Sequence, residues 1–150
     1  MSPRHVHTVV LALFALVLAT GLAWAADLPT TLMDPYLRIH VSLADDKLEG
    51  ATVAAKALSA EAQKLGAKAN GVATNATKLA AAKDIALART AFGDLSEAMM
   101  AYAKATGATF GRDVNVAYCP MVQKSWLQKG QTIANPYYGK SMLTCGEIRK

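Results

Sequence analysis

The residues best suited to chemistry in this sequence are four sulfur-bearing side chains near its C-terminal end. Cys119 and Met121 form one pair, and Met142 and Cys145 form another, each within one turn of chain. Thiolate and thioether sulfurs are soft donors, which suit Cu(I) or Ag(I) better than hard cations. If the two pairs fold against each other, the pattern predicts a soft-metal site of two or four sulfurs. Because a thiolate must lose its proton to bind, metal affinity should fall at low pH.

The two cysteines also suit a disulfide, and the residues by themselves leave both interpretations open. Two cysteines in an exported protein bond by default, since exported proteins fold in oxidising compartments. A bond between Cys119 and Cys145 would close a loop of roughly 26 residues, worth about 3 kcal/mol in the chain-entropy treatment. Composition alone favours this disulfide over the metal site. Trp126, Tyr137 and Tyr138 would be its packing partners.

Catalysis is not expected. His40 is the only histidine beyond residue 7, and it falls inside a helical pattern with no nucleophile near it in the sequence. The chain has no glycine-rich phosphate loop, no HExxH motif and no CxxC motif. Its carboxylates are sparse and suggest no acid–base pair. We therefore predict a binding protein rather than an enzyme.

The N-terminal residues predict a secretory signal peptide over residues 1–25. Arg4 provides the positive charge typical of the start of a signal peptide, and an apolar run extends from Val9 to Leu18. Ala23-Trp24-Ala25 then has the small-x-small pattern of a cleavage site. An uncleaved membrane anchor is the alternative, because the apolar run could nearly span a bilayer. The cleavage pattern favours removal, so we expect a periplasmic or secreted protein that leaves the membrane after cleavage.

Residues 26–150 are predicted to form a single domain. Removing Arg4 with the leader changes the formal charge from +5 to 15 − 11 = +4. The basic residues are spread singly along the chain, whereas a nucleic-acid-binding surface needs them clustered. We therefore expect no nucleic-acid partner.

Residues 26–107 are predicted to be helical. Leu32, Tyr36, Ile39 and Leu43 recur at helical spacing, and Asp34-Pro35 suits the start of a helix. Three further helices are expected: one capped by Asp46, a short one from about residue 75, and one that begins at Asp84 and ends at Gly107.

Residues 108–150 show no sustained period and are predicted to be an irregular Cys/Met/aromatic segment. Only Val114 to Tyr118 alternates as a brief extended stretch would. The predicted fold class is therefore all-α: an antiparallel bundle of about four helices, with this irregular segment packed over one end.

The C-terminal residues resemble the signature of an uncharacterised family of exported bacterial helical domains, a family known only as a domain of unknown function. The matching residues are Tyr118, Cys119, Pro120, Met121, Trp126, Leu127, Ile133, Asn135, Pro136, Tyr137, Tyr138, Gly139, Met142, Leu143, Cys145 and Gly146. The helices before them fit the family too, but less specifically.

The resemblance implies a function for the sulfur atoms. Members of that family occur alone or beside heavy-metal-binding modules and the periplasmic adaptors of copper/silver efflux pumps. By that resemblance we expect a periplasmic copper-binding protein and an efflux or envelope protein as its partner. Cys119, Met121, Met142 and Cys145 are its predicted ligands. Supporting roles fall to Tyr118, Pro120, Lys124, Trp126, Asn135, Pro136, Tyr137, Tyr138 and Gly146. A disulfide-closed interaction module of the cell envelope, without metal, is the alternative.

Overall fold

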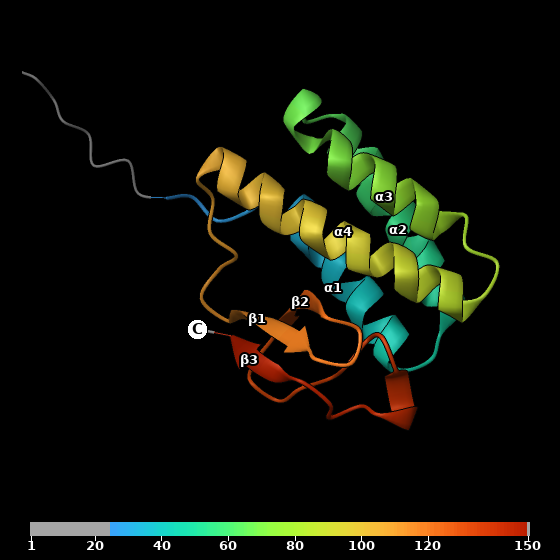
Figure 1. The fold of residues 1–150 in the computed structure, drawn as a ribbon. Coiled ribbons are helices and arrows are strands. Elements are labelled where there is room, and N and C mark those ends of the chain that lie inside the picture. The colour runs from blue at the N-terminus through green and yellow to red at the C-terminus, as the bar shows by residue number, and fades with distance from the viewer. Residues whose placement is uncertain (1–24, 150) are drawn as a thin grey trace, which may run out of the picture.

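A computed structural model describes residues 25–149, and within them four α-helices precede a small β-sheet (Figure 1). The helices are α1 (Thr30–Ala44), α2 (Leu48–Gln63), α3 (Asn70–Ala80) and α4 (Ile85–Thr106). The strands are β1 (Val114–Cys119), β2 (Lys124–Lys129) and β3 (Glu147–Arg149). Two short 3₁₀ turns, η1 (Ala67–Ala69) and η2 (Gly139–Ser141), complete the elements. The predicted signal peptide lies outside the described residues, apart from Ala25.

The prediction of an all-α fold is wrong. The C-terminal segment, residues 108–149, contains a three-stranded antiparallel sheet in the order β2-β1-β3, so the fold is mixed α/β. The alternation from Val114 to Tyr118 marked β1 correctly, but β2 does not alternate. Its residues Trp126, Leu127 and Gln128 are consecutive and all buried, because protein covers both faces of the strand. A strand buried on both faces has no period of two to detect.

The predicted apolar stripe of α1 is confirmed, although its predicted start is not. Leu32, Tyr36, Ile39 and Leu43 are all fully buried. The helix begins at Thr30, after Pro29, so Pro35 lies inside it rather than at its first position. Burial of this stripe against the other elements outweighs the one helical hydrogen bond that Pro35 removes.

The middle helices are built largely from buried alanines. Ala51, Ala55 and Ala62 of α2 are fully buried, as is Ala76 of α3, and such small side chains let helix backbones approach closely. α3 starts at Asn70, five residues before the predicted position. The two connections that precede these helices make no side-chain cap to them.

Both predicted ends of α4 are confirmed. The Asp84 carboxylate accepts a hydrogen bond from the Leu87 amide at 2.8 Å, as an N-cap does. Gly107 adopts the left-handed conformation at φ 69°, which stops the helix. α4 is the longest helix, and its buried Phe92, Leu95 and Met99 anchor the centre of the core.

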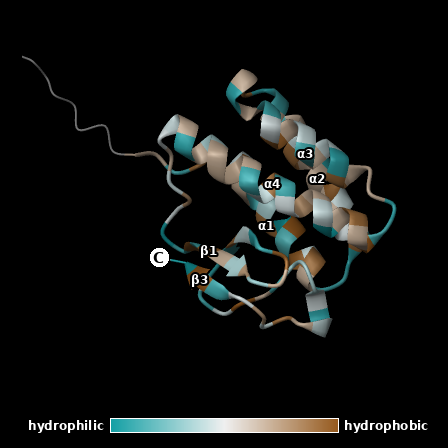
Figure 2. Cartoon of the chain, viewed as in Figure 1, coloured by the Kyte–Doolittle hydropathy of each residue, from teal (hydrophilic) through white to brown (hydrophobic). Residues whose placement is uncertain are grey.

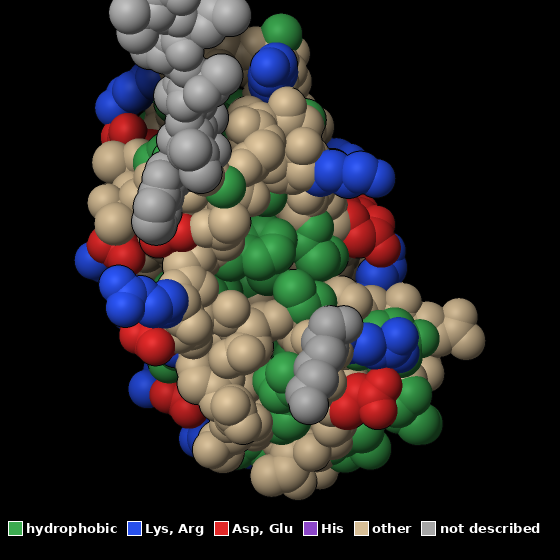
Figure 3. Space-filling view, turned by 90° about the vertical axis from the view of Figure 1, so that its left-hand side faces the viewer, with side chains coloured by type: hydrophobic (Ala, Val, Ile, Leu, Met, Phe, Trp, Pro, Cys, Tyr) green, Lys and Arg blue, Asp and Glu red, His purple; other side chains and the backbone are tan. Residues whose placement is uncertain are grey.

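Consecutive helices pack against each other, and the sheet lies across α1 and α4 (Figure 1). Hydrophobic and hydrophilic residues are interleaved along each helix, as expected for elements with one buried face (Figure 2). On the face drawn in Figure 3, hydrophobic side chains gather at the centre, and charged side chains of both signs surround them. Within residues 25–149, no helix is both long and apolar enough to cross a membrane.

The outer edge of β2 is closed by two tyrosines from outside the sheet. The Leu127 amide donates to the Tyr36 hydroxyl at 3.0 Å, and the Tyr137 hydroxyl donates to the Ser125 carbonyl at 2.7 Å. An unpaired strand edge exposes hydrogen-bonding groups that would otherwise pair with another chain. These two contacts satisfy one donor and one acceptor of the edge, and the Tyr36 contact binds the sheet to α1.

Candidate metal centre

Cys119 is the last residue of β1 and is fully buried. It lies opposite Lys124 in the hairpin, and the turn between them is closed by Gln123 in a left-handed conformation at φ 54°. The hairpin therefore places one sulfur of the predicted site in the core rather than on the surface.

Cys145 reaches the same place from the other side of β1. Tyr118 pairs with Glu147 of β3, and continuing this antiparallel register by two residues brings Cys145 opposite Pro120. The chain passes there only because residue 146 is glycine. A Cβ atom on Gly146 would lie 2.9 Å from the Trp126 ring and 2.9 Å from the Tyr118 carbonyl oxygen. The Cys-Gly dipeptide thus brings the second sulfur beside the first.

The two thiols, which we call the thiol pair, are neighbours and both are free. Partial burial raises the pKa of the Cys145 thiol, and the nearby Cys119 side chain raises this pKa further. The structure therefore brings the two predicted cysteines together. Neither bonded sulfurs nor a group of three His, Cys, Asp or Glu side chains able to hold a metal occurs among residues 25–149.

Asn135 is the polar centre of this site. Its fully buried side chain donates from Nδ2 to Cys119 Sγ at 3.3 Å and to the Cys145 carbonyl at 2.6 Å. Its Oδ1 accepts from the amides of Tyr137 and Tyr138, at 2.8 and 3.3 Å. One side chain therefore aligns the loop, the hairpin and the strand that carry the thiol pair, and it supplies an N–H donor to one sulfur.

Aromatic rings pack in the core near Cys119. Trp126 is fully buried and meets Tyr137 edge-on, with ring centroids 5.8 Å apart. Tyr137 also packs against Phe92 of α4 at 6.0 Å. Burial raises the pKa of the Tyr137 hydroxyl, and the charges of Tyr36 and then Cys119 are among the further causes. The fully buried Cys119 side chain therefore lies in the same part of the core as these rings.

The two predicted methionine ligands lie at the surface. Met121 is 62 % exposed in the hairpin turn, and Met142 is 38 % exposed. Met142 shares a turn with Cys145, whose amide donates to the Met142 carbonyl at 3.0 Å. In contrast, Met33 and Met99 of the helices are buried. The structure therefore brings the cysteines together but leaves both methionines at the surface.

The other predicted supporting residues divide between the site and its surroundings. The Arg149 guanidinium stacks over the Tyr118 ring at 3.9 Å. Pro120 is exposed in the hairpin turn, and Pro136 accepts a hydrogen bond from Arg89 at 3.0 Å. Lys124 does not face the thiol pair, because it forms ion pairs with Glu97 and Asp94 of α4 at 2.7 and 3.5 Å.

Arg89 was not predicted, yet it joins the helices to the C-terminal segment. Besides Pro136, it donates to the Leu43 carbonyl at 3.3 Å and to the Asp46 carboxylate at 2.5 Å. The Arg89 hydrogen bond is the main reason that the pKa of Asp46 is lowered. Asp46 therefore holds Arg89 instead of capping α2, as its sequence position had suggested. Nothing in the sequence marks these partners, since each lies more than 40 residues from Arg89.

His40 also ties a helix to this region. Its Nε2 donates to the Ala134 carbonyl at 2.7 Å, next to Asn135 in the chain. Burial lowers the pKa of the imidazole, although the Ala134 carbonyl partly opposes this effect. Within the described residues, no hydrogen bond links His40 to either thiol.

Comparison with known proteins finds a family match for the helical part of the chain but not for residues 112–150. A family described as "Protein of unknown function (DUF3347)" matches residues 32–111, which include all of α2, α3 and α4 and nearly all of α1. No curated protein and no solved structure matches the chain. The thiol pair lies beyond the matched residues.

Proposed function

We propose that this chain, which belongs to the DUF3347 family of proteins of unknown function, is an exported protein that binds Cu(I). The cargo is held between the sulfur atoms of Cys119 and Cys145. Met121 and Met142 support the site from its solvent side. The observation that carries this proposal is that two free cysteine side chains lie near each other, one fully buried and the other half-buried.

The donor set suits a soft ion of low coordination number. Two thiol sulfurs supply too few ligands for Zn²⁺, which takes four in structural sites. Cu(I) favours soft sulfur donors, and replacing the thiol protons with one Cu(I) leaves a single negative charge on the pair. The Asn135 amide supports that charge through its N–H contact with Cys119.

The surroundings of the thiol pair fit a carrier. Cys145 is only half-buried, so an ion can arrive from its side, whereas Cys119 is closed off by the core. Two exposed thioethers adjoin that side in the sequence. The resemblance of the C-terminal residues to a signature found beside copper/silver efflux adaptors suggests an efflux or envelope protein as the recipient. Export through the predicted signal peptide would place the protein in the periplasm.

The test is an anaerobic Cu(I) titration of the reduced mature chain against a chromophoric chelator. We expect one Cu(I) per chain, and at least about a tenfold loss of affinity in Cys119→Ser and in Cys145→Ser, since each removes one of two thiolates. Affinity should fall as the pH is lowered, because the Cys145 thiol must lose its proton. Unchanged binding in both variants would overturn the proposal.

The methionine variants have a matched control within the chain. Met121→Leu and Met142→Leu should each weaken binding modestly. Met99→Leu replaces a buried helical methionine and should have no effect on copper. If all three substitutions changed Cu(I) affinity equally, the exposed thioethers would be excluded as copper ligands.

The second candidate is a disulfide-closed interaction module without metal, which the proximity of the two thiols also favours. Counting free thiols after purification without reductant separates the two. No free thiol, together with no Cu(I) bound after reduction, would establish the module and exclude the carrier. A count of two free thiols would exclude the module.

A further inference from the structure

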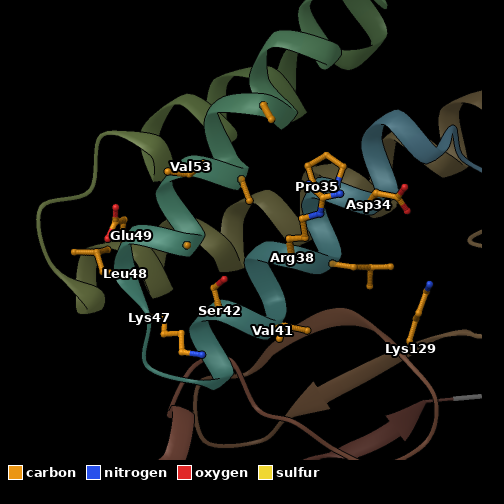
Figure 4. A pocket seen from close by; sticks show the side chains of 14 residues that line it. Asp34, Pro35, Arg38, Val41, Ser42, Lys47, Leu48, Glu49, Val53 and Lys129 are labelled. Atoms are coloured by element: carbon orange, nitrogen blue, oxygen red, sulfur yellow. The ribbon is translucent and has the colours of Figure 1, made fainter.

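A groove runs between α1 and α2 on the outside of the bundle, away from the thiol pair. Its volume is about 1100 Å³, and both helices and the end of β2 line it (Figure 4). Leu37 and Ala54 contribute apolar atoms to it. The helices approach closely at one end, where a Cβ on Gly50 would lie 2.7 Å from the Ser42 hydroxyl.

Exposed aliphatic side chains concentrate on this groove. Val53 is 64 % exposed and Val41 is 56 % exposed. Among the described residues, the four helices carry three large hydrophobic side chains that are more than half exposed: Val53, Val41 and Leu87 of α4. Two of the three therefore border the groove. Val53 stands in a row with Glu49 and Ala57, four residues apart, which is the ridge that one helix presents to the groove of another.

Charged residues of both signs flank the apolar centre. Asp34 and Arg38 stand on α1 toward one end of the groove, with Lys129 near them, and Lys47 and Glu49 stand at the other end (Figure 4). Among residues 25–149 no ion pair involves Asp34, Arg38 or Glu49. Lys47 makes only an exposed pair with Asp45, at 3.2 Å. Such exposed pairs contribute little to stability, so these charges are free to serve an interface.

We propose that the α1–α2 groove is the interface of a symmetric dimer, in which a second copy of this chain presents the same face. In this dimer the twofold axis crosses the groove at right angles, which sets its Lys47–Glu49 end against the Asp34–Arg38 end of the partner. Asp34 then lies near the partner's Lys47, and Glu49 lies near the partner's Arg38 and Lys129. Each contact occurs twice.

The mixed charges favour a second copy over a partner of single charge. An interaction surface for an acidic or a basic partner would carry mainly one sign, whereas each end of this groove carries both. The 14 residues that line it are fewer than the 20–30 a side of a standard stable interface. The dimer is therefore weak and forms at high protein concentration.

The test is sedimentation equilibrium of the mature chain over roughly 5–500 µM, a range suited to micromolar dissociation constants. The wild type should pass from monomer toward dimer. Val53→Lys should remain a monomer over the whole range, because it places a charge at the apolar centre. Leu87→Lys is the matched control, since Leu87 is 55 % exposed on α4, outside the groove. It should behave as the wild type.

Charge reversal tests the symmetry. Asp34→Lys and Lys47→Glu should each weaken the dimer several-fold, since each opposes like charges across the axis. The double variant should recover the wild-type association. The residues changed in the variants of this and the preceding test are all exposed: Asp34, Lys47, Val53 and Leu87. Circular dichroism should therefore show unchanged helix content in every variant.

A monomeric wild type at every concentration would overturn the proposal. So would a dimer that Val53→Lys does not weaken, because its interface would then lie elsewhere. A dimer that Val53→Lys abolishes but the double charge variant does not restore would overturn the twofold arrangement stated above.

Discussion

The helical bundle and the C-terminal segment are held together in different ways. In α2 and α3 the buried residues are mostly alanines and leucines, and stability comes from many small apolar contacts spread along the helices. In residues 108–149 a few side chains with several hydrogen bonds each carry the structure, with Asn135 and Gln128 both fully buried. From this difference we expect a substitution in the bundle to lower its stability in proportion to the side-chain volume removed. In the C-terminal segment, substitution of a few particular residues should cause most of the loss of stability.

Trp126→Ala should have the largest effect, a loss of about 3–5 kcal/mol in the free energy of unfolding, because it removes the largest fully buried side chain. Hydrogen exchange by mass spectrometry should show faster exchange in residues 108–149 than in α3, which makes few or no contacts with the sheet. Phe92→Ala is the matched change in the bundle and should act on both regions. Equal exchange increases everywhere in Trp126→Ala would show that the two regions form one cooperative unit.

Gly139→Ala should come next, with a loss of about 2–4 kcal/mol. Gly139 has φ 57°, which alone costs an alanine about 1–2 kcal/mol. The added Cβ would also lie 2.0 Å from an Asp46 oxygen and 2.2 Å from an Arg89 nitrogen, which forces the pair that joins the regions to move. Gly107→Ala has a similar φ of 69° with open space around it, so it measures the backbone term alone. If Gly139→Ala and Gly107→Ala lose equal stability in urea denaturation, the Asp46–Arg89 pair moves away from the added Cβ without measurable cost.

Asp84→Ala should cost about 1 kcal/mol, since it removes only the N-cap of α4. This is the small, local loss expected of the bundle. Thermal unfolding followed by circular dichroism measures it, and Asp84→Asn, which keeps a capping oxygen, should recover most of the stability. A loss several times larger would contradict the picture of a bundle stabilised by distributed contacts.

His40→Gln should leave stability near neutral pH almost unchanged but alter its pH dependence. Burial lowers the pKa of folded His40 below its ordinary value of 6.5. Between these two pKa values the unfolded chain binds a proton that the folded chain does not, so wild-type stability should fall as the pH drops below about 6.5. Glutamine can still donate to Ala134 without titrating, so the variant should show a shallower fall. Parallel pH profiles from urea denaturation would exclude His40 as the cause.

Local patterns were sufficient for most of the bundle. The stripe of α1 and both ends of α4 could be predicted because period, N-cap and C-terminal glycine act over a few residues. The same rules failed at Asp46, which looks like an N-cap. The Asp46 carboxylate instead accepts a hydrogen bond from Arg89, which is 43 residues away in the chain. They also placed the start of α3 at about residue 75, whereas packing on α2 and α4 extends this helix back through Asn70-Gly71, a pair that ordinarily favours a turn.

The sheet could not be predicted as a sheet for a related reason. β1 has a weak alternation, but β2 is buried on both faces and β3 has three residues, so neither carries a period of its own. Pairing with β1 defines both strands, and pairing depends on residues far apart in the chain. The fold class was therefore mistaken where non-local contacts decide the structure.

By itself the sequence determined which sulfur atoms the C-terminal segment contains: two thiols and two thioethers near them in the chain. It also determined the helices, because their signals are local. Only the tertiary structure decided that Cys119 and Cys145 lie near each other, since their proximity depends on the register of β3 against β1 and on the close approach of Gly146 to Trp126. It also decided that the methionines stay at the surface. Neither outcome is encoded in the spacing of the sulfurs, because spacing along the chain does not define distance between strands.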